Sequence, residues 1–531
     1  MLLEIKDLRI DGSDLDGKTV EIVKGVSLSV DRGQVLGLIG ESGAGKSTIG
    51  LAALGYVRPG CRFTGGSVRL DGQDVVNAPL DLLLQIRGRK VAYVAQSAAA
   101  SFNPAHRLID QICEVHQRHG LGPRADAEKR TVELFRKLGL PAPENFGQRY
   151  PHQVSGGQLQ RAMTVMALIA KPDLVVFDEP TTALDVTTQI EVLAAMRAAI
   201  REEGAAALYV THDLAVVAQV ADKILVLRHG NAVELGDTRQ VLEAPREEYT
   251  RALVSVRKSE SNERGAHAKA PVLEVQSIDA AYGQQKVLFD VSLLVEHAAT
   301  VAVVGESGSG KSTLARVITG LLPPSKGRIR FQGEDLSPAL AGRTKEHRRR
   351  LQLIYQMPDV AVNPRHTVLE IIGRPLTFYA GLRGADVRRK VEELLARIEL
   401  PAHFADRFPG ELSGGQKQRV CIARALAAEP ELIICDEVTS ALDPLVADEI
   451  LKLLLKLQDE QGVSYLFITH DLATVKAIAH EVVVMQRGRV VDSGRKEEVM
   501  APPFHDYTGK LLRSVPEMRT DWLDEVLAGR V

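Results

Sequence analysis

Short runs of apolar residues recur along the chain and predict buried strands. Four uninterrupted runs stand out, at residues 35–39, 174–177, 301–304 and 432–435. Apolar runs of this length are typical of strands that are covered on both faces. Residues 97–172 and 357–430 instead have the patterning of helices, whereas residues 1–7 alternate like a strand. The pattern predicts an α/β protein in which each half has a core of strands and an inserted helical segment.

The two halves of the chain repeat one another. The segment GESGAGKST at residues 40–48 returns as GESGSGKST at residues 305–313, an offset of 265 residues (305 − 40). The later pairs are VAQ and IYQ, which end at Gln96 and Gln356, then VSGGQ and LSGGQ, Asp-Glu twice, and Thr-His-Asp twice, and the last three pairs share an offset of 258 residues (412 − 154). A repeat of this length predicts two domains. We place them at residues 1–256 and 271–531, joined by a polar linker at residues 257–270.

Each GESGxGKST segment follows an apolar run, which is the setting of a phosphate-binding loop. The glycines let backbone N–H groups surround an anion, the lysine reaches the β- and γ-phosphates, and the next serine can hold Mg²⁺. A chance match is expected in about one such chain in fifty, so two matches indicate a nucleotide-binding protein. The expected phosphate-binding residues are Gly40, Ser42, Gly43, Gly45, Lys46, Ser47 and Thr48, and Gly305, Ser307, Gly308, Gly310, Lys311, Ser312 and Thr313.

Two further motifs add chemistry to these loops. Asp178-Glu179 and Asp436-Glu437 follow apolar strands. The aspartate suits a Mg²⁺ shell, and the glutamate can polarise an attacking water, a role that accelerates reactions by about 10²–10⁴-fold. The Ser-Gly-Gly-Gln segments precede helices and offer a second place for an anion. These segments are Ser155, Gly156, Gly157 and Gln158, and Ser413, Gly414, Gly415 and Gln416.

The ordered set of motifs resembles that of the ATP-binding cassette (ABC) ATPases, and the resemblance covers nearly the whole chain, twice. It implies two tandem P-loop NTPase domains, each with an α/β RecA-like core, an antiparallel β subdomain and an inserted helical subdomain. It also implies ATP and Mg²⁺ as cofactors, ATP hydrolysis as the reaction, and head-to-tail cassettes. Each ATP would then lie between the phosphate loop of one cassette and the Ser-Gly-Gly-Gln signature of the other.

The resemblance assigns residues to two such composite sites. The first would contain Lys46, Ser47, Gln96, Asp178, Glu179 and His212 with Ser413, Gly414 and Gly415. The second would contain Lys311, Ser312, Gln356, Asp436, Glu437 and His470 with Ser155, Gly156 and Gly157. The expected catalytic residues are Glu179, Glu437, His212 and His470, and the expected Mg²⁺ ligands are Ser47, Gln96 and Asp178, and Ser312, Gln356 and Asp436. Asp185 and Asp443 resemble the D-loop aspartates of the family.

The family also stacks an aromatic side chain on adenine. Tyr282 is the expected stacking residue of the second site, whereas residues 1–55 contain no aromatic residue and Ile10 lies near the equivalent place. We therefore expect weaker adenine binding at the first site.

Two local patterns resemble the ATPases of oligopeptide, dipeptide and nickel importers, here with two cassettes fused. They are Asn103-Pro104 and Asn363-Pro364 after the glutamines, and Tyr249-Thr250 and Tyr507-Thr508 near the end of each cassette. This resemblance implies an ATP-hydrolysing subunit that serves two membrane permease subunits and an extracytoplasmic substrate-binding protein. The permeases would dock near Gln96 and Gln356. The chain would then be peripheral, at the cytoplasmic face of the bacterial inner membrane.

Composition narrows the alternatives without closing them. The net charge of −2 gives no general attraction for nucleic acid, and we expect the basic run at residues 343–350 to be a solvated helix face. A tandem ABC ATPase that acts on ribosomes or nucleic acid remains an alternative, although the linker is short for that class. A tandem sugar-importer ATPase is another, although its second cassette often has degenerate motifs.

Overall fold

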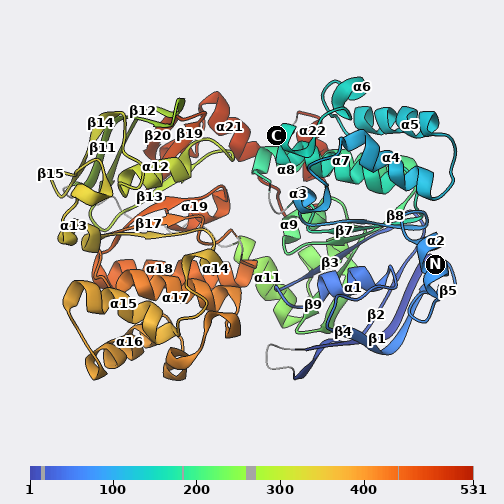
Figure 1. Cartoon of the computed structure of the whole chain (residues 1–531), viewed down its shortest axis with the longest axis horizontal. Helices are drawn as coiled ribbons and strands as arrows, with labels where there is room; N and C mark the ends of the chain where they lie inside the picture. The colour runs from blue at the N-terminus through green and yellow to red at the C-terminus, as the bar shows by residue number, and fades with distance from the viewer. Residues whose placement is uncertain (14–17, 182–183, 259–270, 441, 530–531) are drawn as a thin grey trace. The chain divides into compact units, whose positions relative to one another are not determined.

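The computed structural model describes residues 1–13, 18–181, 184–258, 271–440 and 442–529, and the chain folds into two compact units (Figure 1). The first unit is Met1–Arg257 with Pro516–Val531, and the second is Lys258–Val515. Most of the expected linker, residues 259–270, lies outside the described residues.

A mostly parallel sheet forms the core of the first unit. Its described strands are β3 (Val35–Gly40), β6 (Val91–Val94), β7 (Leu174–Asp178), β8 (Ala206–Val210), β9 (Lys223–Arg228) and β10 (Asn231–Asp237). They run in the order β10-β9-β3-β8-β7-β6, and neighbours are parallel except β10 and β9. Every residue of β3, β7 and β8 is buried, because parallel sheets are covered on both faces. The chain therefore leaves β3 and β7 at the same edge of the sheet.

An antiparallel sheet packs beside this core. Its described strands are β1 (Leu3–Ser13), β2 (Thr19–Val30), β4 (Cys61–Leu70) and β5 (Gln73–Asp74), in the order β2-β1-β4-β5. Leu3, Ile5 and Ile10 are almost fully buried in a cluster shared with β3 and β7. The alternating pattern at the N-terminus thus predicted a strand correctly.

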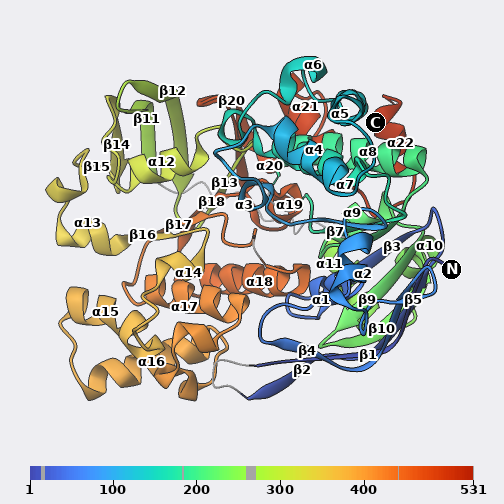
Figure 2. The same cartoon turned by 45° about the vertical axis from the view of Figure 1, so that its right-hand side comes forward.

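The helices of the first unit divide into two groups. A helical subdomain contains α3 (Ala98–Ser101), α4 (Leu108–Arg118), α5 (Arg124–Lys137), α6 (Pro143–Phe146) and α7 (Gly156–Leu168). The others are α1 (Lys46–Ala52), α2 (Leu80–Ile86), α8 (Val186–Glu203), α9 (Leu214–Ala218), α10 (Thr238–Glu243) and α11 (Glu248–Lys258). Figures 1 and 2 both show α4, α5 and α7 on one side of the core sheet and the antiparallel sheet on the other.

The second unit repeats both sheets in the same order. Its core strands are β13 (Thr300–Val304), β16 (Leu351–Ile354), β17 (Leu432–Asp436), β18 (Ser464–Ile468), β19 (Glu481–Gln486) and β20 (Arg489–Arg495), and its antiparallel strands are β11 (Pro271–Tyr282), β12 (Gln285–Glu296), β14 (Lys326–Phe331) and β15 (Glu334–Asp335). The described strands run β16-β17-β18-β13-β19-β20 and β12-β11-β14-β15.

The helices of the second unit also repeat those of the first. Its helical subdomain contains α14 (Pro358–Ala361), α15 (Val368–Ala380), α16 (Ala385–Arg397) and α17 (Gly414–Leu426). The others are α12 (Lys311–Ile318), α13 (Lys345–Arg350), α18 (Pro444–Gln461), α19 (Leu472–Ile478), α20 (Lys496–Val499) and α21 (Asp506–Arg513), while α22 (Trp522–Leu527) belongs to the first unit. The expected fold class is confirmed in both units. Within the described residues, no helix combines the length and the apolar character of a membrane span.

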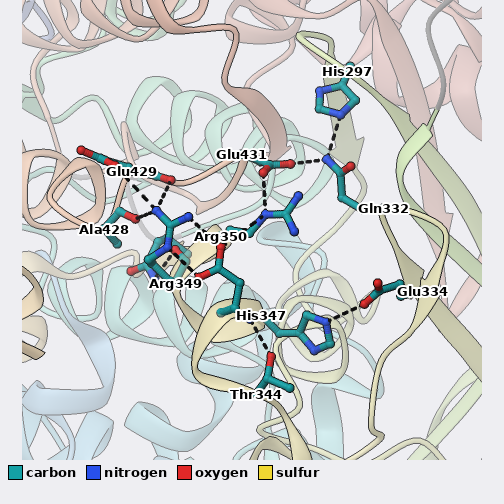
Figure 3. A network of polar contacts seen from close by, with 12 residues as sticks. His297, Gln332, Glu334, Thr344, His347, Arg349, Arg350, Ala428, Glu429 and Glu431 are labelled. Atoms are coloured by element: carbon teal, nitrogen blue, oxygen red, sulfur yellow. Dashed lines mark hydrogen bonds and ion pairs between the residues drawn. The ribbon is translucent and has the colours of Figure 1, made fainter. Parts of the chain in front are cut away.

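Polar side chains in the second unit join helix α13 to the start of strand β17 (Figure 3). Gln332 donates to Glu431, and its amide nitrogen lies 2.8 Å from Nε2 of His297. Arg350 donates to the other carboxylate oxygen of Glu431, and Arg349 donates to the carbonyl oxygen of Ala428 at 3.0 Å. These contacts fix the turns at the amino-terminal ends of the core strands. The phosphate loop and the acidic pair lie at the opposite, carboxyl-terminal ends.

Our prediction that residues 343–350 form a solvated helix face is therefore wrong in part. Arg343 is 4% exposed and donates to the carbonyl oxygens of Ile318 and Ser337. Burial lowers the pKa of Arg343 to about 10. The last turn of a helix leaves carbonyl groups without intrahelical partners, and the buried guanidinium meets that need at the end of α12.

The last residues of the chain pack with the first unit. Gln219, which follows α9, donates to the carbonyl oxygens of Glu517 at 2.8 Å and Arg519 at 2.9 Å, and accepts from the N–H of Leu523 at 3.1 Å. Our expected second domain, residues 271–531, therefore extends past the second unit, which ends at Val515.

Candidate nucleotide sites

In both phosphate loops the lysine is buried and bonded to the backbone of its own loop. Lys46 donates from Nζ to the carbonyl oxygens of Gly40 at 2.6 Å and Glu41 at 2.8 Å. In the second loop, Lys311 makes the corresponding bonds at 2.7 and 2.8 Å. The ammonium group is thus fixed beside the loop that would receive a phosphate.

The glycines of the loop are required for two different reasons. A Cβ on Gly40 would lie 2.1 Å from the carbonyl oxygen of Leu227, so there is no room for a side chain. Gly43 has a φ of +82°, and nothing lies within 4 Å of a Cβ built there. A left-handed turn beside open space lets loop N–H groups face an anion. Gly305 and Gly308 repeat both features.

The other expected loop residues lie beside these glycines. Gly45 and Gly310 occupy the N-cap positions of α1 and α12. Thr48 and Thr313 lie in the first turns of the same helices, and Ser42 and Ser307 are exposed in the loops.

The predicted Mg²⁺ ligands from the loop and the acidic pair lie next to one another. Ser47, near the start of α1, donates from Oγ to Oδ1 of Asp178, the last residue of β7, at 2.7 Å. Ser312 and Asp436 make the same contact at 3.0 Å. A hydroxyl oxygen keeps its lone pairs after donating a proton, so each pair presents hard oxygen ligands that fit Mg²⁺.

The predicted catalytic glutamates are held by side chains from two further elements. Gln96, just after β6, donates to Glu179 at 3.2 Å, and Nδ1 of His212, just after β8, lies 3.4 Å from the other carboxylate oxygen. Gln356 and His470 contact Glu437 in the same way, at 2.7 and 3.4 Å. Each cassette thus brings its glutamine, glutamate and histidine together.

The backbone of both glutamates is strained. Glu179 has a φ of +48° and Glu437 a φ of +51°, in the left-handed region that side chains with a Cβ rarely adopt. Such strain is concentrated at functional sites. The N–H of Glu179 donates to the carbonyl oxygen of Val210 at 2.9 Å, which fixes this backbone against β8.

Burial and neighbouring groups shift the pKa values of Asp436 and Glu437, the acidic pair of the second site. Burial raises the pKa of Asp436; the hydrogen bond from Ser312 opposes this rise, and the charge of Glu437 adds to it. Burial also acts to raise the pKa of Glu437, but the hydrogen bond and charge of His470 hold it below its ordinary value. Burial acts to lower the pKa of His470, yet its bond to Glu437 raises it overall. Glu437 therefore stays ionised, as a base for water requires.

The signature segments form exposed helix starts within their own cassettes. Ser155 accepts from the N–H of Gln158 at 3.3 Å, and the Gln158 side chain accepts from the N–H of Ser155 at 3.2 Å, which is a capping box at the start of α7. Ser155 and Gly156 are exposed, but Gly157 is buried, and a Cβ there would lie 2.3 Å from Thr188. Ser413, Gly414, Gly415 and Gln416 repeat the capping box at α17.

The D-loop aspartates cap the next helices. Asp185 accepts from the N–H of Thr188 at 3.0 Å, and Asp443 accepts from the N–H of Val446 at 3.1 Å. The alanines of the two Ala-Leu-Asp motifs lie outside the described residues.

Tyr282 ends strand β11 and is 42% exposed, with its hydroxyl accepting from Arg316 of α12 at 2.9 Å. Strands β1 and β11 pair in the same way in their sheets: Leu3 pairs with Leu70, and Leu273 pairs with Phe331. The two strands are therefore related by an offset of 270 residues (273 − 3), and Tyr282 corresponds to Gly12 (282 − 270). Ile10, which we placed near the equivalent position, lies two residues before Gly12 and is fully buried in β1.

Two tyrosines at the sites were missed by the sequence reasoning. Tyr93 of β6 donates to Oδ2 of Asp178 at 2.6 Å, and burial, together with this bond, raises the pKa of its hydroxyl. Tyr507 accepts from the N–H of Glu306 in the second phosphate loop at 3.1 Å. Tyr507 belongs to the Tyr-Thr pattern and could have been singled out from it, whereas no motif marks Tyr93.

Two protein families match the chain. The ABC transporter family matches residues 23–182 and 288–440. A second family, described as the oligopeptide/dipeptide transporter C-terminal region, matches residues 233–278 and 491–531. Each cassette is thus followed by its own copy of this C-terminal region.

Curated proteins match over nearly the whole chain. The glutathione import ATP-binding protein GsiA of Pectobacterium atrosepticum is 36% identical over 97% of this chain and 89% of its own length. The peptidoglycan transport ATP-binding protein YejF of Agrobacterium fabrum is 37% identical over 96% of both chains. Among solved structures, the archaeal ribosome recycling factor aABCE1, in complex with the stalk protein aP1, has a TM-score of 0.61 and 20% identity over 92% of this chain. At that identity the likeness concerns the fold alone.

The motifs, the paired sites and these relatives agree. The chain belongs to the ABC transporter family, as two ATP-binding and ATP-hydrolysing cassettes of the oligopeptide/dipeptide type in one polypeptide.

Proposed function

We propose that this protein is the ATPase subunit of an importer for peptide-like solutes, namely glutathione, dipeptides, oligopeptides or related small solutes such as nickel chelates. The observation that carries the proposal is the oligopeptide/dipeptide C-terminal region behind each cassette. The printed names of the relatives, which refer to glutathione import and peptidoglycan transport, support the same class of cargo.

We propose the same division of labour at both sites. Mg²⁺, when bound with ATP, supplies charge neutralisation at the β- and γ-phosphates. Ser47 and Asp178 hold the metal together with Gln96, while Lys46 contacts the phosphates. Glu179 accepts a proton from the attacking water, and Gln96 and His212 keep its carboxylate in place. The second site uses the corresponding residues.

Each site is completed by the signature of the other cassette. Ser413 and its glycines serve the nucleotide held by Lys46, and Ser155 and its glycines serve the one held by Lys311. The exposure of Ser155, Gly156, Ser413 and Gly414 within their own units supports this role, because an exposed helix start can receive phosphate.

The partners are two membrane permease subunits and an extracytoplasmic substrate-binding protein, with the chain peripheral at the cytoplasmic face of the bacterial inner membrane and no nucleic acid involved. Permease helices dock near Gln96 and Gln356. In the second unit, Tyr355, Met357 and Val360 beside Gln356 are 40%, 54% and 76% exposed, which suits an apolar partner.

The test is to isolate the chain with its membrane partners and to measure uptake into vesicles. Glutathione, a dipeptide, a nickel chelate and a disaccharide are offered in turn, with ATP inside. We expect uptake of at least one of the first three, abolished by Lys46→Ala with Lys311→Ala. Uptake of the disaccharide alone, or ATP hydrolysis stimulated by ribosomes and by no membrane partner, would contradict the proposal.

A further inference from the structure

The carboxylate of Asp178 accepts two hydrogen bonds from hydroxyl groups, one on each oxygen. Ser47 donates to Oδ1 at 2.7 Å, and Tyr93 donates to Oδ2 at 2.6 Å. Tyr93 lies in β6, which runs parallel to β7 and pairs Tyr93 with Val176, two residues before Asp178. The phenol therefore comes from the neighbouring core strand. The Tyr93 side chain packs against the hydrophobic core of the unit.

The second cassette lacks this contact. Leu353 of β16 pairs with Ile434, two residues before Asp436, and so holds the position that Tyr93 holds in the first cassette. Among the residues that the structure describes, the only side chain that donates to Asp436 is Ser312, at 3.0 Å. Asp178 is 4% exposed, whereas Asp436 is more exposed.

We propose that Tyr93 is a positioning residue that strengthens metal-dependent ATP binding at the first site and has no counterpart at the second. The inference rests on the proposed role of Ser47 and Asp178 as Mg²⁺ ligands. A carboxylate with one donor can rotate about its last bond, whereas donors on both oxygens fix its plane before the metal arrives. Outer partners that orient a ligand in this way typically change metal affinity by about 10–100-fold.

A competing effect has the opposite sign. A hydroxyl that donates to a carboxylate withdraws some of its negative charge and so weakens its attraction for a cation. The hydroxyl of Ser47 has this effect in the first cassette and that of Ser312 has it in the second, so it does not distinguish them. Because Tyr93 contacts Oδ2 from a packed strand, its main consequence is fixed orientation, and its removal should weaken the metal-bound state alone.

The experiment measures the metal-dependent part of nucleotide binding in the full chain. Lys311→Ala confines a non-hydrolysable ATP analogue to the first site, and its Kd is measured with excess Mg²⁺ and with EDTA. We expect Tyr93→Phe, which keeps the ring and removes the hydroxyl, to raise the Kd with Mg²⁺ about tenfold. The Kd in EDTA should not change. Tyr93→Leu, which copies the residue of the second cassette, should give the same result.

Matched variants separate the possible failures. Tyr93→Phe in a Lys46→Ala chain should leave binding at the second site unchanged, as should Leu353→Phe. Asp178→Ala should abolish the Mg²⁺ effect at the first site. If Asp178→Ala has its effect and both Tyr93 variants bind like the parent, the role of Tyr93 is overturned while the metal site stands. If Asp178→Ala also leaves the Mg²⁺ effect intact, the metal assignment fails, and the role of Tyr93 fails with it. Equal weakening in Mg²⁺ and in EDTA would reduce Tyr93 to a packing residue and overturn the inference.

Discussion

At the scale of single residues, the two nucleotide sites share their core contacts and differ at their edges. Glutamine, glutamate and histidine make the same contacts in both. Two of the differences involve tyrosines. Tyr93 contacts the predicted metal ligand Asp178 of the first site, where the second cassette has Leu353. Tyr282 lies beside the second site, where the first cassette has Gly12. We therefore expect the asymmetry to affect Mg²⁺ binding in the first cassette and adenine binding in the second.

The adenine contact gives a prediction at this scale. Tyr282 is exposed and its hydroxyl is held by Arg316, so its ring is free to stack on a base. An aromatic contact contributes about 0.5–1.5 kcal/mol, which is a few-fold to about tenfold in affinity. In a Lys46→Ala chain, Tyr282→Ala should weaken ATP binding at the second site by this factor and reduce its preference for ATP over GTP. Tyr282→Phe should change neither.

Binding of both nucleotides is measured by titration in EDTA, where Tyr93 has no influence on the comparison between sites. The first site, in a Lys311→Ala chain, should bind ATP as weakly as the Tyr282→Ala second site. If the first site and the second site with Tyr282 intact bound ATP with equal affinity, this prediction would be wrong.

The residues that a motif marks were predictable, and those that act through tertiary contact were not. Lys46, Ser47, Asp178 and their repeats follow from spacing, because a phosphate loop and an acidic strand end have fixed chemistry. Tyr93 lies in a four-residue strand with no pattern of its own, and its importance depends on the register of β6 with β7.

At the scale of elements, the apolar runs predicted the inner strands well, because a strand covered on both faces has a continuous apolar sequence. The C-terminal segment was not predictable. Its partners, Gln219 and Arg197, are about 300 residues away in sequence. Ala477 and Leu455 occupy the repeat positions, 258 residues on, so only the first cassette has these polar partners.

This segment gives a prediction that its own fluorescence can report. Trp522 is the single tryptophan of the chain and is 1% exposed. Gln219→Ala leaves backbone groups of residues 517, 519 and 523 without their partner, at a cost of about 1–3 kcal/mol. The red shift of Trp522 emission should therefore occur at lower urea concentration than in the parent.

The matched control is Gln189→Ala, which deletes the same side chain from α8, where it contacts Thr181 instead. That variant should keep the urea midpoint of the parent. If the urea transition of the Gln219→Ala chain coincides with those of the parent and of the Gln189→Ala control, Gln219 does not hold the segment.

At the scale of the whole molecule, a repeat within one polypeptide fixes the ratio of the two cassettes at one to one. The order of motifs predicted this organisation and the fold of each half. It did not predict that the second unit ends at Val515, because the boundary depends on where Trp522 and its neighbours are buried rather than on the repeat.

The shared-site proposal is tested with paired substitutions. Lys46→Ala with Ser413→Arg removes two parts of one composite site, whereas Lys46→Ala with Ser155→Arg damages both sites. The first pair should keep more single-site ATPase activity in a steady-state assay. Equal residual activity in the two pairs would argue against cassettes that complete one another.

The most direct test of the account is the steady-state ATPase rate of the full chain with one glutamate changed at a time. Glu179 and Glu437 have the same strained backbone and the same two partners, so both sites should hydrolyse ATP. Glu179→Gln and Glu437→Gln should each lower the rate by at least about tenfold while ATP still binds, since general-base catalysis contributes about 10²–10⁴-fold. A rate that is unchanged by either substitution would contradict the claim of two hydrolytic sites.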